Sequence, residues 1–188
     1  MLETPLIILT KRFILRPLDE GDVTIRYVGW FCEQVVQQYI SAATASPDIA
    51  ALRQFVVERN GRDDVVFLGI FEKKNGLHIG NIKYEPVDSV AGYAIGGILI
   101  GDPHWRGMGV AVEVLWASAN WLHKHRNIRQ IVLGVDRANT AAINAYRKVG
   151  FIEESTAFIP TVLPGCLTMV WHLTSCEGAS SIKPITGR

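Results

Sequence analysis

Cysteine is scarce in this sequence, and the few cysteines form no recognisable pattern. Cys32, Cys166 and Cys176 are odd in number and far apart, so they indicate neither a disulfide framework nor a zinc knuckle. Metal-ligand spacing is also missing among the histidines, since His123 and His125 are two residues apart and would point in different directions from a helix. We therefore expect no bound metal and a reduced, cytoplasmic setting.

An excess of charge of one sign is lacking too. The chain has 19 Lys and Arg against 18 Asp and Glu, which is not the balance of a domain that binds nucleic acid through a basic surface. No apolar run approaches the roughly 20 residues of a membrane-spanning helix, and residues 1–5 do not open a secretion signal. We expect neither nucleic acid nor a membrane as a partner.

What is present is the composition of a globular domain. The chain has 188 residues, 48% of them hydrophobic, which is enough to bury a core without cross-links. Residues 175–188 are rich in Gly, Ser and Pro and are predicted to form a flexible tail. We expect one domain over residues 1–174, acting as a monomer or a homodimer.

Hydrophobic periodicity and turn signals predict an α+β chain. The expected elements, in chain order, are strands within 6–17, a helical region over 19–39, a helix opened by 46–48, strands over 65–72, 78–86 and 93–100, a helix from about 106 to 125, a strand over 131–135, a helix over 139–150, and strands over 151–152 and 167–173. An antiparallel meander is thus followed by strand–helix–strand crossovers. This order predicts a mixed, mostly antiparallel central sheet flanked by helices.

The segment 106–111 has the composition of an anion-binding helix start. Its small residues let a ligand approach the unpaired backbone N–H groups of the first turn, and the helix dipole favours negative charge there. Arg106 would add a cation beside these groups. The residues expected to hold a pyrophosphate are Arg106, Gly107, Met108, Gly109, Val110 and Ala111.

Other interpretations of this glycine-rich segment differ in how well they fit. A P-loop needs Gly-Lys-Ser/Thr, which is absent, and a dinucleotide fingerprint needs a small residue where Val112 stands. Asp136 nevertheless follows the next predicted strand, where a dinucleotide-binding unit uses a carboxylate on ribose, so that alternative stays open. So does a purely structural role, in which Gly107 and Gly109 only shape a turn.

Two separated motifs together resemble the acetyl-CoA signature of the GCN5-related N-acetyltransferase (GNAT) family. They are Arg106-x-x-Gly109-x-Ala111 and Asn139-x-x-Ala142-x-x-x-Tyr146-x-Lys148-x-Gly150-Phe151. The opening Thr10-x-Arg12-x-x-Leu15-Arg16-Pro17-Leu18 is similar to the branch that includes the ribosomal-protein N-terminal acetyltransferases. Residues 79–83 and 98–102 resemble members that acetylate amino sugars on nucleotide carriers. The resemblance covers about residues 8–173.

The resemblance implies a three-layer α/β fold in which a parallel, splayed pair of strands binds acetyl-CoA as a co-substrate. Backbone groups of residues 99–101 would face the pantetheine arm, and Asn139 would touch the cofactor near that arm. The residues implied in cofactor binding, beyond the pyrophosphate loop, are Leu99, Ile100, Gly101, Asn139, Ala142 and Tyr146.

The implied reaction is attack of a neutral amine on the thioester carbonyl, through an oxyanion that collapses to an amide and a thiolate. By resemblance, Tyr146 would donate a proton to the departing sulfur; alternatively it is an ordinary core aromatic of an apolar helix face. The strand over 93–101 contains no carboxylate, so we expect the general base elsewhere. Glu85 is the first candidate, ahead of Asp88 and Glu113.

These observations predict an N-acetyltransferase that acetylates a primary amine, with a small molecule such as an amino-sugar nucleotide as the acceptor. Tyr27, Trp30 and Phe31, in the first helical region, are candidate acceptor contacts. The alternatives are a protein N-terminal-amine acetyltransferase, a non-catalytic acyl-CoA or nucleotide-binding module, and a protein-interaction domain in which the glycine segment is only structural.

Overall fold

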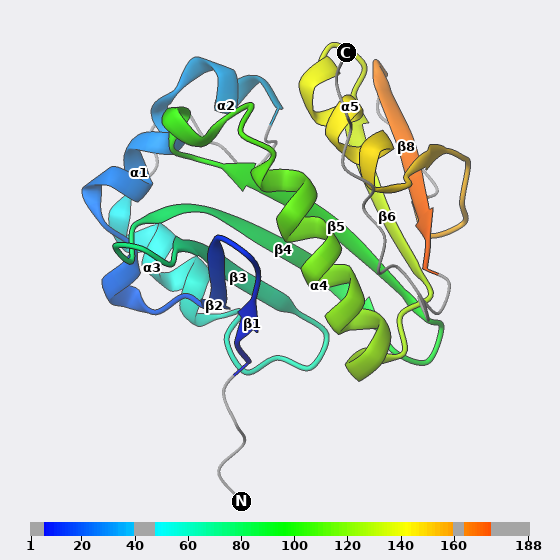
Figure 1. Ribbon diagram of the computed structural model, residues 1–188, viewed down its shortest axis with the longest axis horizontal. Helices are drawn as coiled ribbons and strands as arrows, with labels where there is room; N and C mark the ends of the chain where they lie inside the picture. Colours follow the sequence, from blue (N-terminus) through cyan, green and yellow to red (C-terminus); the bar gives the residue numbers. More distant parts are fainter. Residues whose placement is uncertain (1–5, 40–47, 160–163, 174–188) are drawn as a thin grey trace, which may run out of the picture.

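A mixed sheet runs through the middle of the molecule (Figure 1). The computed structural model describes residues 6–39, 48–159 and 164–173, so the predicted tail at 175–188 lies outside the described residues. Within those ranges the sheet has eight strands in the order β1-β2-β3-β4-β5-β6-β8-β7. The strands are β1 (Ile8–Leu9), β2 (Phe13–Pro17), β3 (Val66–Glu72), β4 (His78–Asp88), β5 (Tyr93–Ile100), β6 (Gln130–Asp136), β7 (Ile152–Glu153) and β8 (Cys166–His172).

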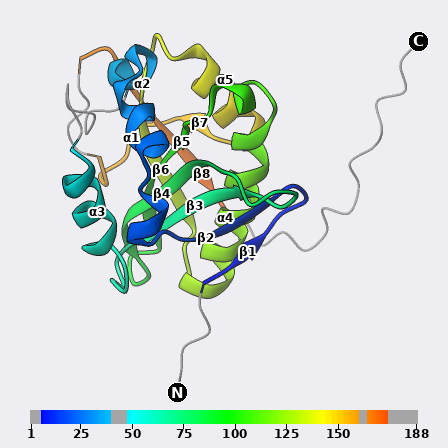
Figure 2. The same ribbon diagram turned by 90° about the vertical axis from the view of Figure 1, so that its left-hand side faces the viewer.

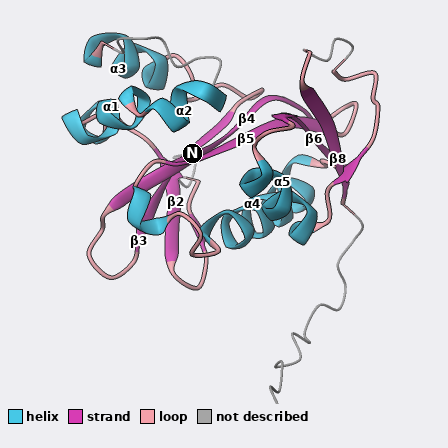
Figure 3. Cartoon of the chain, turned by 90° about the horizontal axis from the view of Figure 1, so that it is seen from above, coloured by secondary structure: helices cyan, strands magenta, loops and turns pink. Residues whose placement is uncertain are grey.

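Helices cover both faces of this sheet and make three layers. Figure 3 shows α1, α2 and α3 on one side of the strands and α4 and α5 on the other. The helices are η1 (Glu20–Asp22), α1 (Ile25–Cys32), α2 (Gln34–Tyr39), α3 (Ile49–Val57), η2 (Pro103–Trp105), α4 (Val110–Arg126) and α5 (Thr140–Val149). None of those in the described part is long and apolar enough to cross a membrane.

Side-chain caps explain where several helices begin and end. The Thr24 hydroxyl accepts from Tyr27 N at the start of α1, and the Asn139 side chain accepts from Ala142 N at the start of α5. Gly150 ends α5 with a φ of 116°, which suits glycine. The helical region expected over 19–39 is three separate pieces, because the extended backbone of Glu33 (ψ 128°) ends α1.

Two hydrophobic cores lie on the two faces of the sheet. The larger core packs α4 and α5 against the strands and includes Val114, Leu122 and Tyr146. The smaller core packs α1 and α3 against the other face and includes Trp30 and Leu99. Because side chains alternate along a strand, β5 supplies residues to both cores, as β3 does.

The pairing of β5 with β6 is parallel and short. The two strands are in register only from Tyr93↔Gln130 to Ile95↔Val132, although β5 continues to Ile100 and β6 to Asp136. Beyond this point β5 stays paired with β4, and β6 stays paired with β8 along its whole length. Figure 3 shows the two halves of the sheet diverging here. This confirms the expected splayed parallel pair in a mostly antiparallel sheet.

The dinucleotide-binding alternative is wrong. That interpretation needs a largely parallel, doubly wound sheet, whereas β5 and β6 are the one parallel pair among the described strands. The carboxylate of Asp136 accepts a hydrogen bond from Ala138 N at 2.7 Å. Asp136 therefore shapes the turn between β6 and α5.

Gly101 allows α1 to lie against the end of β5. A Cβ placed on Gly101 would come 2.0 Å from Cδ2 of Trp30. The Trp30 ring is only 3% exposed and packs edge-on against Tyr27, with the ring centroids 5.3 Å apart, so it has little room to move. Gly101 is needed for this packing whatever it does for a ligand.

We expect Gly101→Ala to lower the free energy of unfolding by about 1–3 kcal/mol, because the new methyl group overlaps a buried indole. Urea denaturation measures the loss. Gly97→Ala is the matched control, since a Cβ at Gly97 meets nothing within 4 Å, and it should change stability by about 1 kcal/mol or less. Equal stability of the two variants would contradict the packing role of Gly101.

Candidate functional site

The loop between β5 and α4 is shaped by two glycines in the left-handed region. Gly107 has a φ of 73° and Gly109 a φ of 72°, a conformation that other residues adopt only at a cost. Gly109 is the N-cap of α4, and no side chain caps the helix there. The structure thus confirms that the segment 106–111 is a loop followed by the first turn of a helix.

This loop presents a row of free backbone donors. No described group accepts a hydrogen bond from the N–H groups of Gly107, Gly109, Val110, Ala111 or Val112. Gly107 and Gly109 are exposed, so a ligand can reach them. Free N–H groups at the positive end of a helix 17 residues long form a site for an anion.

Arg106 does not supply the free cation that was expected beside this loop. Its Nε donates to Ile100 O at 3.0 Å and its Nη2 donates to Gly101 O at 2.7 Å, while Nη1 pairs with Glu33 at 2.7 Å. The guanidinium is therefore bound to the end of β5 and to the junction of α1 and α2. Pattern alone does not show which acceptors surround this side chain, and a role of Arg106 at the pyrophosphate stays a prediction.

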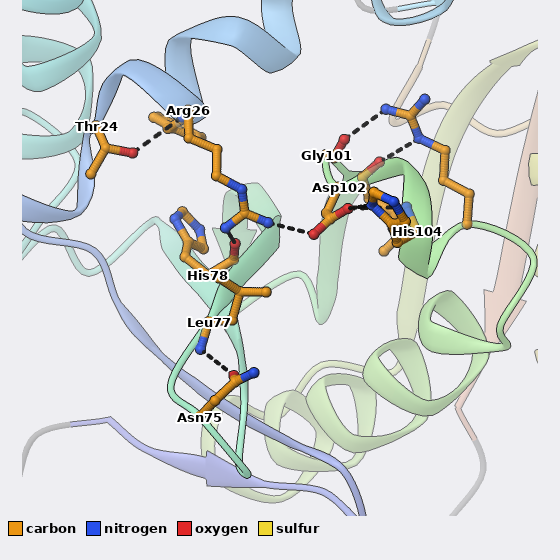
Figure 4. A network of polar contacts seen from close by, with 11 residues as sticks. Thr24, Arg26, Asn75, Leu77, His78, Gly101, Asp102 and His104 are labelled. Atoms are coloured by element: carbon orange, nitrogen blue, oxygen red, sulfur yellow. Dashed lines mark hydrogen bonds and ion pairs between the residues drawn. The ribbon is translucent and has the colours of Figure 1, made fainter.

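A second polar network connects α1 to the same end of β5 (Figure 4). Arg26 pairs with the carboxylate of Asp102 and donates to His78 O. Burial lowers the pKa of His78 to about 4, so the ring is neutral near pH 7, and its Nε2 donates to Gly80 O at 2.9 Å. These residues were not predicted from the sequence, where Asp102 stands out only as a turn residue before Pro103.

The middle of β5 is open on one face and closely covered on the other. A Cβ at Gly96 would lie 2.8 Å from the ring of Tyr84, so Gly96 lets that ring lie against the strand below α4. Gly97 points to the opposite face, is exposed and has no neighbour that a Cβ would meet. The backbone of β5 is therefore accessible from the face that carries α1 and α3, close to where β6 departs.

The ring of Tyr146 is buried in the larger core. Burial raises its pKa to about 12. Among the described residues, none forms a hydrogen bond with this hydroxyl. By contrast, the hydroxyl of the fully buried Tyr84 pairs with Ser118 Oγ at 2.8 Å.

The carboxylates considered as bases all have partners. Glu85 lies in ion pairs with Arg59 at 3.0 Å, Arg62 at 3.1 Å and Lys83 at 2.9 Å. Burial alone would raise the pKa of Glu85, but the hydrogen bond and charge of Lys83 and the charge of Arg59 outweigh it and lower that pKa. Three cations thus make Glu85 a weaker proton acceptor than an isolated carboxylate.

The other two acids hold local structure. Asp88 accepts from Val90 N and Ala91 N in the turn before β5, and Glu113 accepts three hydrogen bonds from the turn between β1 and β2. Neither carboxylate is free to act as a base. Within the described ranges, no three His, Cys, Asp or Glu side chains gather as metal ligands.

The remaining predicted residues divide between surface and core. Asn139 and Ala142 form the start of α5, directly after β6. Leu99 is buried in the smaller core beside the rings of Tyr27, Trp30 and Phe31. Those three aromatic residues are buried and pack α1 on the sheet, and the interpretation of them as acceptor contacts stays a prediction. Their apolar spacing was the signal of a core helix face.

Comparison with known families gives one match over most of the chain. The model of the acetyltransferase (GNAT) domain matches residues 12–152. Comparison with curated proteins gives no match.

Solved structures with the same fold include several acetyltransferases. The acetyltransferase from Salmonella typhimurium that modifies the N-terminal serine of ribosomal protein L7/L12 is similar with a TM-score of 0.75 and 18% identity, covering 90% of this chain and 100% of that one. A chimera of the Vibrio cholerae spermidine N-acetyltransferase and hSSAT is similar with a TM-score of 0.71 and 18% identity, covering 86% of this chain and 96% of that one. AAC(6')-Ib in complex with ribostamycin and coenzyme A is similar with a TM-score of 0.70 and 19% identity, covering 90% of this chain and 98% of that one.

Proposed function

Because this chain belongs to the GNAT acetyltransferase family, we propose that it transfers the acetyl group of acetyl-CoA to a primary amine by direct attack. The observation that carries this proposal is the early separation of β5 from β6, after Ile95 and Val132. It leaves backbone groups of β5 without a strand partner close to the loop whose N–H groups are free. Such a strand and such a loop suit the two parts of the cofactor, a pantetheine arm and a pyrophosphate.

In this proposal the cofactor lies along the splay. The pyrophosphate accepts hydrogen bonds from the free N–H groups of Gly107 and of residues 109–112, at the positive end of α4. The pantetheine arm follows the end of β5 at Leu99, Ile100 and Gly101, with Asn139 and Ala142 on the side of α5. No step of the reaction calls for a metal.

The chemistry then proceeds at the open middle of β5. The amine nitrogen attacks the thioester carbonyl carbon, and the C–S bond breaks when the tetrahedral oxyanion collapses. Tyr146 gives its phenolic proton to the leaving sulfur and regains a proton from water. Its raised pKa of about 12 keeps the phenol protonated throughout the neutral range, although it also makes the phenol a weaker acid than an ordinary tyrosine. We assign the proton lost by the amine to water at the face on which Gly97 is exposed.

The class of acceptor rests on resemblance more than on charge. Arg59, Arg62 and Lys83 surround Glu85, and Arg62 also pairs with Asp64 at 2.7 Å. Glu58 and Asp63 belong to the same stretch of chain, so this cluster has no excess of positive charge. Because residues 79–83 and 98–102 resemble enzymes that acetylate amino sugars on nucleotide carriers, we propose this class ahead of a protein N-terminus.

An acceptor screen with labelled acetyl-CoA tests the proposal directly. Amino-sugar nucleotides, polyamines, aminoglycosides and peptides with free N-termini are compared at equal concentration, and kcat/KM is measured for each acceptor. Preference for polyamines or peptides would contradict the phosphate-bearing acceptor. Absence of acetyl-CoA binding in calorimetry would reject both the enzyme and the non-catalytic binding module.

We expect Tyr146→Phe to lower kcat by about 100-fold or more, because general acid catalysis contributes that much when a proton must reach the leaving group. The Kd for acetyl-CoA should change little. Tyr84→Phe is the matched control, since it also removes a hydroxyl from the same core but one that is paired with Ser118. Equal kcat in the two variants would remove Tyr146 from the mechanism.

We expect Glu85→Gln to lower kcat by less than about tenfold, because ion pairs already weaken this carboxylate as a base. The pKa of Glu85 lies below the usual glutamate value of 4.5, so the carboxylate is ionised at every pH above 4.5. Any activity that depends on this ionisation is therefore lost only as the pH falls below 4.5. A pH–rate profile from pH 4 to 9 measures this. A 100-fold loss in kcat would identify Glu85 as the base after all.

We expect Gly109→Asp to weaken acetyl-CoA binding by about 100-fold or more. The substitution puts a side chain and a negative charge among the phosphate-binding N–H groups, at a φ of 72° that disfavours any side chain. Calorimetry measures the Kd, and Gly109→Ala separates backbone strain from charge. A Kd within threefold of the wild-type value would contradict the placement of the pyrophosphate.

A further inference from the structure

The turn between β1 and β2 carries a cation next to the start of α4. A Cβ placed on Gly109 would lie 3.9 Å from Nη2 of Arg12, and Gly109 is the residue that caps the helix. Figure 2 shows the hairpin of β1 and β2 beside α4. The tertiary fold therefore brings Arg12 to the loop, although almost a hundred positions separate the two in the sequence.

The orientation of Arg12 is set by Glu113, one turn into α4. Glu113 Oε1 accepts from the Thr10 hydroxyl and from Arg12 N, and Glu113 Oε2 accepts from Arg12 Nε, each at 2.7 Å. Burial opposes ionisation of Glu113, but these hydrogen bonds outweigh it and lower its pKa, so the carboxylate keeps its charge. The guanidinium also lies over the ring of Phe13, 4.9 Å from its centroid.

This arrangement leaves one edge of the guanidinium unused. The Nε of Arg12 donates to Glu113, and no described group accepts a hydrogen bond from either Nη atom of Arg12. The side chain is 34% exposed, so a ligand at the loop can reach the free edge. A guanidinium has donors placed to meet phosphate oxygens, whereas the donors of Arg106 are already occupied.

We propose that Arg12 is the cation that binds the pyrophosphate of acetyl-CoA, and that Thr10 and Glu113 are positioning residues that aim it. The inference rests on the proposed function, which places the pyrophosphate at the loop before α4. Backbone N–H groups carry only partial charges, and the free Nη groups of Arg12 add charge-assisted donors beside Gly109, while the pair with Glu113 offsets the net charge of the guanidinium. The assignment is to the pyrophosphate because the Nη2 atom lies at the N-cap of the helix.

The direct test compares three ligands in Arg12→Gln and in the wild type. Coenzyme A has both the pyrophosphate and the 3′-phosphate, dephospho-coenzyme A lacks the 3′-phosphate, and acetyl-pantetheine lacks both. We expect the Kd of the first two to rise by about 10- to 100-fold, the value of one charge-assisted contact. The KM for acetyl-pantetheine should change less than about twofold.

Lys11→Gln is the matched control. Lys11 is the neighbouring exposed cation, so its removal changes the net charge equally without touching the guanidinium. We expect its Kd for coenzyme A to stay within twofold of the wild-type value. Equal Kd values for Arg12→Gln and Lys11→Gln would overturn the inference, as would weaker binding of coenzyme A alone, which would assign Arg12 to the 3′-phosphate.

Glu113→Gln tests the positioning role separately. It removes the charge that orients Arg12 but leaves Arg12 in place, so the Kd for coenzyme A should rise by about 3- to 10-fold, less than in Arg12→Gln. In the double variant the rise should equal that of Arg12→Gln alone, because both changes act through one contact. A hairpin that only stabilises the fold would instead weaken all three ligands equally, and additive losses would reject the positioning role.

Thermal unfolding of each variant keeps the test valid if the hairpin loosens. Should Arg12→Gln fail to fold, Arg12→Lys keeps the charge but lacks the planar fork, and its Kd for dephospho-coenzyme A is expected to rise by about 3- to 10-fold. An unchanged Kd in folded Arg12→Lys would overturn the recognition by a guanidinium. A wild-type protein that binds no coenzyme A would reject the proposed function itself, a result distinct from every outcome above.

Discussion

The separation of β5 from β6 is the constraint on which the rest of the site depends. A buried strand normally gives all its backbone groups to its neighbours, and β5 keeps only three residues in register with β6 before the strands part. Each strand stays paired on its outer edge, β5 with β4 and β6 with β8, so the two halves of the sheet diverge as units. The opening is therefore maintained by the whole sheet, and the backbone groups it frees are what a ligand can use.

The polar residues around this opening mostly serve to hold its edges. Arg106 ties the end of β5 to Glu33, Arg26 ties α1 to Asp102, and Arg12 ties the first hairpin to α4. In each case an arginine bridges two elements that are distant in the sequence. Arg12 differs from Arg106 because its Nη edge remains free, which is why one cation of the loop is structural and the other is available for recognition.

The reactive side of the splay has few titratable groups that are free to act. The Tyr146 hydroxyl has no hydrogen-bond partner among the described residues and keeps its proton, whereas Glu85 is surrounded by cations. A site of this kind suits a reaction in which the cofactor supplies the leaving group and the protein supplies position, one proton donor and backbone hydrogen bonds.

The sequence by itself determined the mixed sheet, the glycine loop before α4 and the start and end of α5, because these follow from local signals: hydrophobic period, glycines at left-handed positions, and the cap at Asn139. Only the tertiary structure decided which charges are free. The partners of Arg106, Glu85 and Arg12 come from other elements of the chain, and a pattern along the sequence carries no record of which acceptor a long side chain meets in space. Whether a charged side chain is free depends on the groups that surround it, and the tertiary fold determines which groups those are.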